Sequence, residues 1–156
     1  AENQLGIVNQ FSRLEESVGL LYETYADIFP DYREFWSNMA SDEHKHAAWI
    51  NKLYSLIDKR TIIFSEGRFK LAALQTFLRY LDEELAKAKT KERSLMNALS
   101  ITLYIEESLI EMKYFEIVEG DSPELKRIFR DLARETQEHV AKARGCLIPT
   151  RTKRSN

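Results

Sequence analysis

The chain has 156 residues, of which 44% are hydrophobic and 31% are charged. This balance is typical of one globular domain that buries a hydrophobic core without needing disulfides or a structural metal. Its net charge of −2 gives no reason to expect a nucleic-acid partner, and its single cysteine excludes an internal disulfide framework and a paired-cysteine metal knuckle. No apolar run is long enough to span a membrane and no signal-peptide core is visible, so we expect a cytoplasmic protein without a membrane partner.

Two helices joined by a tight turn are predicted first. Helical periodicity covers residues 4–29 and ends at Pro30, whose ring and missing N–H group stop a helix. A second helix, 31–58, follows after almost no linker. The next stretch, 59–90, differs in character and contains a shorter amphipathic helix near 71–88.

A second pair of long helices is predicted after this stretch. One covers 91–119 and closes at Gly120, and the other covers 122–145, with the capping residue Asp121 before it and Pro123 in its first turn. Each pair has a tight turn, whereas the middle connection is long. The sequence therefore predicts an all-α, ferritin-like four-helix bundle with one long crossover between helices 2 and 3 that carries a short extra helix.

A basic segment follows the last predicted helix. It begins after Cys146 and includes Arg151, Lys153 and Arg154. Chain termini of this kind are often frayed. We therefore expect one bundle domain over residues 1–146 and a flexible tail over residues 147–156.

The buried face of each long helix, traced at alternating steps of three and four, carries an ionisable group near its middle. Burying an unpaired, charged carboxylate costs on the order of several kcal/mol, unless its pKa shifts until the group is neutral. No lysine or arginine falls on these faces, so the carboxylates call for an external cation, and carboxylates with imidazoles suit iron, manganese or zinc better than magnesium or calcium. The candidate metal ligands are Glu15, Glu43, His46, Glu107, Glu135 and His139.

The two helix pairs look like copies of one unit. Taken at an offset of 92 positions, Glu15 matches Glu107 and Tyr22 matches Tyr114. At an offset of 93, His46 matches His139. Tyr22 and Tyr114 share faces with their glutamates, so they either support the metal ligands or are core tyrosines whose hydroxyls are satisfied elsewhere.

Over residues 5–145 the sequence resembles the rubrerythrin branch of the ferritin-like superfamily. Glu43-His44-Lys45-His46 matches its Glu-x-x-His motif, and Glu15 and Glu107 each match a helix glutamate with a tyrosine seven residues later. The resemblance implies a non-haem dinuclear centre, most simply two iron ions, with manganese or zinc as alternatives, because four glutamates and two histidines are what two ions share in such sites.

The second Glu-x-x-His motif is broken, because the residue three before His139 is Thr136. Glu135 lies four before the histidine and stays on the same helix face. It either substitutes as a ligand with a changed reach or marks a site that has lost part of its metal affinity. On this basis we expect the metal nearer His139 to bind more weakly.

The resemblance implies reduction of peroxide, or reaction with dioxygen, by ferrous iron. Rubrerythrins also carry a cysteine-ligated iron domain that this chain cannot build, so an external electron donor would be required and enzymatic turnover is left open. Two alternatives remain: a ferritin-like bundle with a partly lost metal site that serves as a binding or structural module, which Thr136 favours, and iron storage with ferroxidase activity. The resemblance also suggests a homodimer.

Overall fold

The protein is described by a computed structural model that covers residues 2–58, 63–64, 71–112, 118–119 and 123–155. Side-chain environments are described for residues 9–52, 72–111, 123–124 and 126–148. The elements are α1 (Glu2–Ile28), a 3-10 turn η1 (Pro30–Tyr32), α2 (Arg33–Asp58), β1 (Ile63–Phe64), α3 (Leu71–Lys89), α4 (Leu95–Met112), β2 (Val118–Glu119) and α5 (Pro123–Ser155).

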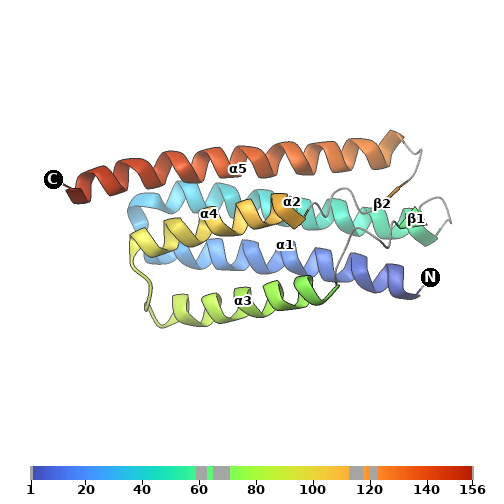
Figure 1. Cartoon of the computed structure of the whole chain (residues 1–156), viewed down its shortest axis with the longest axis horizontal. Coiled ribbons are helices and arrows are strands. Elements are labelled where there is room, and N and C mark those ends of the chain that lie inside the picture. Colours follow the sequence, from blue (N-terminus) through green and yellow to red (C-terminus); the bar gives the residue numbers. More distant parts are fainter. Residues whose placement is uncertain (1, 59–62, 65–70, 113–117, 120–122, 156) are drawn as a thin grey trace.

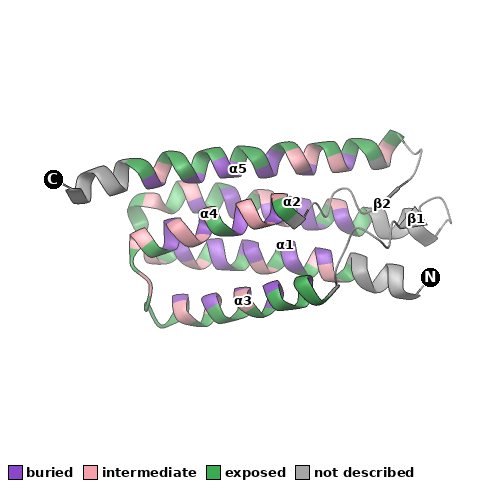
Figure 2. Ribbon diagram, in the orientation of Figure 1, coloured by how far each residue is buried: buried purple, intermediate pink, exposed green. Residues whose placement is uncertain are grey.

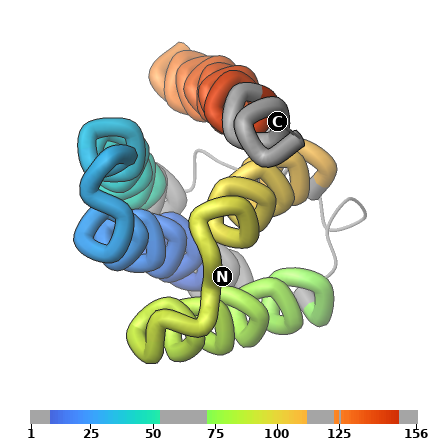
Figure 3. Tube along the Cα trace, turned by 90° about the vertical axis from the view of Figure 1, so that its left-hand side faces the viewer, coloured from blue at the N-terminus to red at the C-terminus, as the bar shows by residue number. Residues whose placement is uncertain are grey.

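Four helices, α1, α2, α4 and α5, lie side by side along the long axis of the molecule (Figure 1). The helix α3 belongs to the crossover between α2 and α4 and packs against α1, as the end-on view shows (Figure 3). The predicted all-α bundle with one long crossover and a short extra helix is therefore confirmed. No helix in the described part of the chain is long and apolar enough to cross a bilayer.

The boundaries of the third bundle helix, α4, differ from the prediction. Helix α4 begins at Leu95 rather than near 91, because Ser94 and Asn97 exchange backbone-to-side-chain hydrogen bonds that cap its first turn. Residues 118–119 form a strand instead of helix, since Val118 pairs with Phe64 and Glu119 with Ile63 in an antiparallel ladder.

The basic segment after Cys146 is helical as far as Ser155, where the sequence suggested a tail outside the bundle. Leu147 is 2% exposed, so the apolar stripe of α5 continues beyond residue 146. A helix whose next turn still buries a leucine has a packing reason to continue, since tertiary packing of the apolar face stabilises most helices in proteins.

The tight turn between α1 and α2 rests on an aromatic cluster. Trp36 is fully buried against Tyr25, Phe29 and Phe35, with ring centroids 5.2 to 5.6 Å apart. The Trp36 indole donates to the Thr102 hydroxyl at 3.0 Å, which ties this turn to α4. The turn therefore fixes how α1 and α2 face α4 at this end of the bundle.

The buried stripes of all the bundle helices face one another (Figure 2). They are apolar for most of their length, as in Leu14, Val18, Leu21, Leu109 and Leu132. Ionisable side chains interrupt them near the middle of the bundle, and this interruption is the most unusual feature of the core.

Candidate metal centre

Five acidic and imidazole side chains meet in the core and are each no more than 1% exposed. They form two groups of three whose ligand atoms lie within 4.8 Å of one another: Glu15, Glu43 and His46 in one group, and Glu43, Glu106 and His139 in the other. We call these five residues the inner cluster. Glu43 belongs to both groups, so the two halves share one carboxylate.

The helices α1, α2, α4 and α5 each supply at least one member of the inner cluster. His46 directs Nδ1 toward Glu15, at 3.6 Å, and toward Glu43, at 3.4 Å. His139 directs Nδ1 toward Glu43, at 2.9 Å, and toward Glu106, at 3.4 Å. Each imidazole therefore presents the same nitrogen to two carboxylates, one of which is the shared Glu43.

Several atoms of the inner cluster are close together without forming hydrogen bonds. Both carboxylate oxygens of Glu43, Oε2 of Glu106 and Nδ1 of His46 and of His139 have no hydrogen-bond partner among the described residues, although all of them are inaccessible to solvent. Buried polar atoms are almost always hydrogen-bonded. Carboxylate oxygens and imidazole nitrogens that converge in this way suit a cation, so the donor set fits a transition metal.

The electrostatics of the inner cluster shift its pKa values strongly. Burial, then the negative charges of Glu15 and Glu106, raise the pKa of Glu43. Burial alone would lower the pKa of both histidines, but their carboxylate neighbours outweigh it and raise the pKa of His46 to about 10 and that of His139 to about 12. Without a metal, protons on these side chains therefore supply the missing positive charge.

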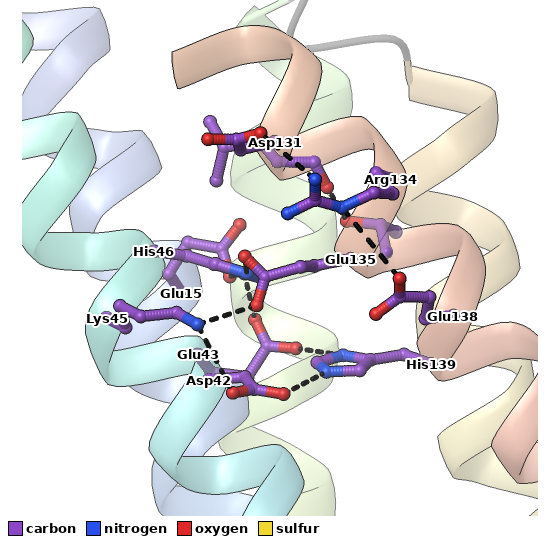
Figure 4. Close-up of polar contacts among 12 residues, drawn as sticks. Glu15, Asp42, Glu43, Lys45, His46, Asp131, Arg134, Glu135, Glu138 and His139 are labelled. Carbon is purple, nitrogen blue, oxygen red and sulfur yellow. Dashed lines mark hydrogen bonds and ion pairs between the residues drawn. The ribbon is translucent and has the colours of Figure 1, made fainter. Parts of the chain in front are cut away.

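Three further charged residues, Asp42, Lys45 and Glu135, lie on the side of the imidazoles that faces away from the inner carboxylates (Figure 4). We call these three residues the outer layer. His139 Nε2 donates to Asp42 Oδ2 at 3.0 Å, and His46 Nε2 lies 3.6 Å from Glu135 Oε2. Lys45 donates to Glu135 at 2.7 Å and lies 3.6 Å from Asp42. The hydrogen bond with Asp42 fixes the orientation of the His139 ring and leaves its other nitrogen available to a metal, whereas Glu135 is close to His46 without a hydrogen bond to it.

Tyr22 supports the inner cluster from α1. Its hydroxyl donates to Oε1 of Glu106 at 2.8 Å, and the tyrosine is fully buried. Burial, then the charge of Glu106, raise its pKa well above the usual value, so Tyr22 is a neutral donor. The contact places the Tyr22 hydroxyl against a candidate metal ligand, and its role in supporting that ligand stays a prediction. Tyr114, its predicted counterpart, lies outside the described residues.

The prediction that Glu107 joins the buried groups is wrong, because Glu106 takes that place. Glu107 is 41% exposed at its side chain and accepts a hydrogen bond from Arg144 at 2.8 Å. The predicted face of this helix was one residue out of register, since Thr102 and Leu109 are buried whereas Leu103 is only partly so. The repeat held the correct signal: at an offset of 91, Leu14-Glu15-Glu16-Ser17 aligns with Ile105-Glu106-Glu107-Ser108, so that Glu15 matches Glu106.

Glu135 is buried beside the inner cluster but does not belong to either group of three. It contacts His46 of the other helix pair rather than His139 of its own helix. The structure therefore does not place Glu135 beside His139 as a substitute ligand, and weaker metal binding near His139 stays a prediction. Sequence reasoning also missed Asp42 and Lys45, which neighbour Glu43 and His46 in the chain and meet Glu135 across the bundle.

A sequence model described as Rubrerythrin matches residues 11–147 of the chain. That range contains every residue of the inner cluster and the outer layer. No curated protein and no solved structure matches the chain.

Proposed function

Because this chain belongs to the rubrerythrin family, we propose that its inner cluster binds two metal ions, physiologically iron, and that the loaded centre reacts with peroxide or dioxygen. The observation that carries the proposal is the shared Glu43, which joins two carboxylate–imidazole groups into one site. Glu15 and His46 would hold one ion, and Glu106 and His139 the other. Manganese or zinc would suit the same donors.

The residues of this chain prepare the site for such chemistry. Two ferrous ions, when bound, supply the two electrons that convert peroxide to water, while the protein contributes binding and orientation. Tyr22 holds Glu106, and Asp42 holds His139, so that each ligand is presented in a fixed orientation. Burial of the inner cluster excludes bulk water from the donors. These 156 residues contain one cysteine and cannot form a cysteine-ligated iron site, so repeated turnover would need an electron donor outside them.

The test is anaerobic titration of the metal-free protein with ferrous iron, followed by one addition of peroxide. We expect two ions per chain and oxidation of two ferrous ions per peroxide, with faster oxidation than for free iron in the same buffer. A double variant, Glu43→Gln with Glu106→Gln, is the control and should bind little iron. Binding without accelerated oxidation would leave the metal site and exclude the redox activity.

A structural module is the second candidate function. The raised pKa values of His46 and His139 favour it, because protonated imidazoles already balance the buried carboxylates without a metal. On this alternative, the purified chain would be fully folded and would bind no iron in the titration above. Iron storage would instead appear as uptake far beyond two ions per chain.

A further inference from the structure

The inner cluster lacks one carboxylate compared with the arrangement that ferritin-like dinuclear centres use. In those centres, both histidine-bearing helices carry a glutamate three residues before the histidine. Glu43 holds this position before His46 on α2, whereas Thr136 holds it before His139 on α5. Thr136 is 1% exposed, so the position lies in the core and not at the surface.

The threonine does not replace the missing donor. Its hydroxyl donates to the carbonyl of Leu132 at 2.8 Å, one turn back on the same helix. A hydroxyl engaged in this way has its proton committed to the backbone, and a neutral hydroxyl is a much weaker metal ligand than a carboxylate. The inner cluster therefore offers three carboxylates and two imidazoles as donors.

The nearest substitute, Glu135, is held in the outer layer. Lys45 binds its Oε1 at 2.7 Å, and its Oε2 faces the outer nitrogen of His46. The inner nitrogen of that ring, Nδ1, faces Glu15 and Glu43 instead. Glu135 would have to leave both contacts to reach the inner side of the imidazole.

The charge of the inner cluster also favours an additional anionic donor. Two divalent ions bring four positive charges, and the histidines bind metal as neutral imidazoles. Glu15, Glu43 and Glu106 bring three negative charges, so one positive charge remains among the inner donors. Asp42, Glu135 and Lys45 in the outer layer together carry one negative charge, and this charge lies on the other side of the imidazoles from the inner donors. A small anion among the inner donors would place a negative charge in direct contact with the ions.

We propose that, because Thr136 stands where a glutamate ligand is expected, the loaded centre takes up a small exogenous carboxylate, of the size of formate or acetate, as an additional ligand at this position. The proposal rests on the proposed function, since it requires two bound ions. A carboxylate fits the position better than a water molecule, because it offers two oxygen donors and a negative charge where a glutamate side chain is missing. Its small size follows from the burial of Thr136 between the helices.

The test uses the full chain loaded with cobalt(II), whose visible spectrum reports changes in coordination and which does not turn over. Acetate is the probe, and sodium chloride at equal ionic strength is the control. We expect acetate to change the visible spectrum saturably and chloride to leave it unchanged. A protein that binds two cobalt ions and shows no acetate response would overturn this inference alone, whereas failure to bind two ions would overturn the proposed function.

Variants decide where the acetate binds. Thr136→Glu supplies the carboxylate from the chain, so its acetate affinity should fall at least about tenfold, because a tethered group competes at high effective concentration. Thr136→Val keeps the shape without the hydroxyl and should respond as the wild type does. An unchanged response in Thr136→Glu would contradict the assignment, and Thr136→Asp provides the same test if that variant does not fold.

Glu135→Gln tests the competing explanation that Glu135 swings inward when metal binds. If Glu135 stays in the outer layer, it does not compete with acetate, so the acetate affinity of the fully cobalt-loaded Glu135→Gln variant should remain within about threefold of the wild type, even though its affinity for cobalt falls. An acetate affinity raised about tenfold or more would mean that Glu135 normally occupies the position, and the inference would be wrong.

Discussion

At the scale of single residues, the site depends on which side of a helix a carboxylate faces. Glu106 and Glu107 are adjacent in α4, yet Glu106 is fully buried in the inner cluster and Glu107 pairs with Arg144 in contact with solvent. Neighbouring residues on a helix are separated by about 100° around its axis, so one step in sequence changes the environment completely. The two glutamates therefore form a natural matched pair for a test.

Replacing each of these glutamates by glutamine separates the inner cluster from the surface. Glu106→Gln removes a charged donor, and we expect metal affinity to fall at least about tenfold. Glu107→Gln removes only an exposed ion pair, whose worth is small, and affinity should stay within about threefold. Calorimetric titration with zinc or cobalt measures both. Equal weakening in the two variants would mean that Glu106 has no special role in binding.

At the scale of elements, α1 and α2 are joined by a histidine that lies between two carboxylates. His44 of α2 contacts Glu16 through Nδ1 at 2.9 Å and Glu23 through Nε2 at 2.6 Å. The ring lies over Gly19, where an added Cβ would be 2.8 Å from ring carbon Cε1, so glycine allows this close approach. Both carboxylates lie on α1, and the contacts therefore depend on how the two helices pack.

The contacts of His44 with Glu16 and Glu23 predict a pH-dependent contribution to the stability of the fold. Burial lowers the pKa of His44, but the hydrogen bonds with Glu23 and Glu16 outweigh it and the net pKa is raised. A raised folded-state pKa gives stabilisation that is fully present below the unfolded value of about 6.5 and is lost as pH rises through the folded value. The wild type should therefore exceed His44→Gln in melting temperature at about pH 6, and the difference should shrink by about pH 9.

The measurement is thermal unfolding of the metal-free wild type and variant, side by side at each pH. Because His46 and His139 are present in both proteins, their titration largely cancels in the difference. The effect should be modest, since His44 and its partners are more than one third exposed and water screens their charges. A difference that grows with pH would contradict the assigned direction of the pKa shift.

At the scale of the whole molecule, metal binding and folding are expected to be linked. The inner cluster draws its donors from α1, α2, α4 and α5, so a bound ion would join all the bundle helices at once. A ligand that binds only the native state raises stability by mass action. Chelation should therefore lower the melting temperature of metal-loaded protein.

Folding should nevertheless survive metal removal. The extensive apolar core remains, and the protonated histidines offset the charge of the buried carboxylates. Circular dichroism should thus show a helical protein with a lower melting temperature, and returning the metal should restore the original value. The same melting temperature before and after verified removal would support the structural-module alternative.

A homodimer and a cytoplasmic location remain predictions from the sequence.

The sequence by itself determined the class and connectivity of the fold. Periodic apolar residues, Pro30 and the long stretch 59–90 were sufficient, because helix length and loop length limit how a bundle can be connected. It also identified Glu15, Glu43, His46 and His139, which the structure brings together in the core. Each of these ionisable residues stands out within an apolar stripe, even when the assumed rotation of the helix is slightly wrong.

The repeat in the sequence supports Glu106 at an offset of 91 and Glu107 at an offset of 92, so only the tertiary structure decided between them. The tertiary structure also placed Glu135 in the outer layer. Helical periodicity is too coarse to resolve one residue, since positions three and four apart share a face equally well. The contact of Lys45 with Glu135 joins residues 90 positions apart, and it exists because α2 and α5 pack at one particular rotation. That rotation is set by the side chains of every bundle helix together, so no local sequence pattern encodes it.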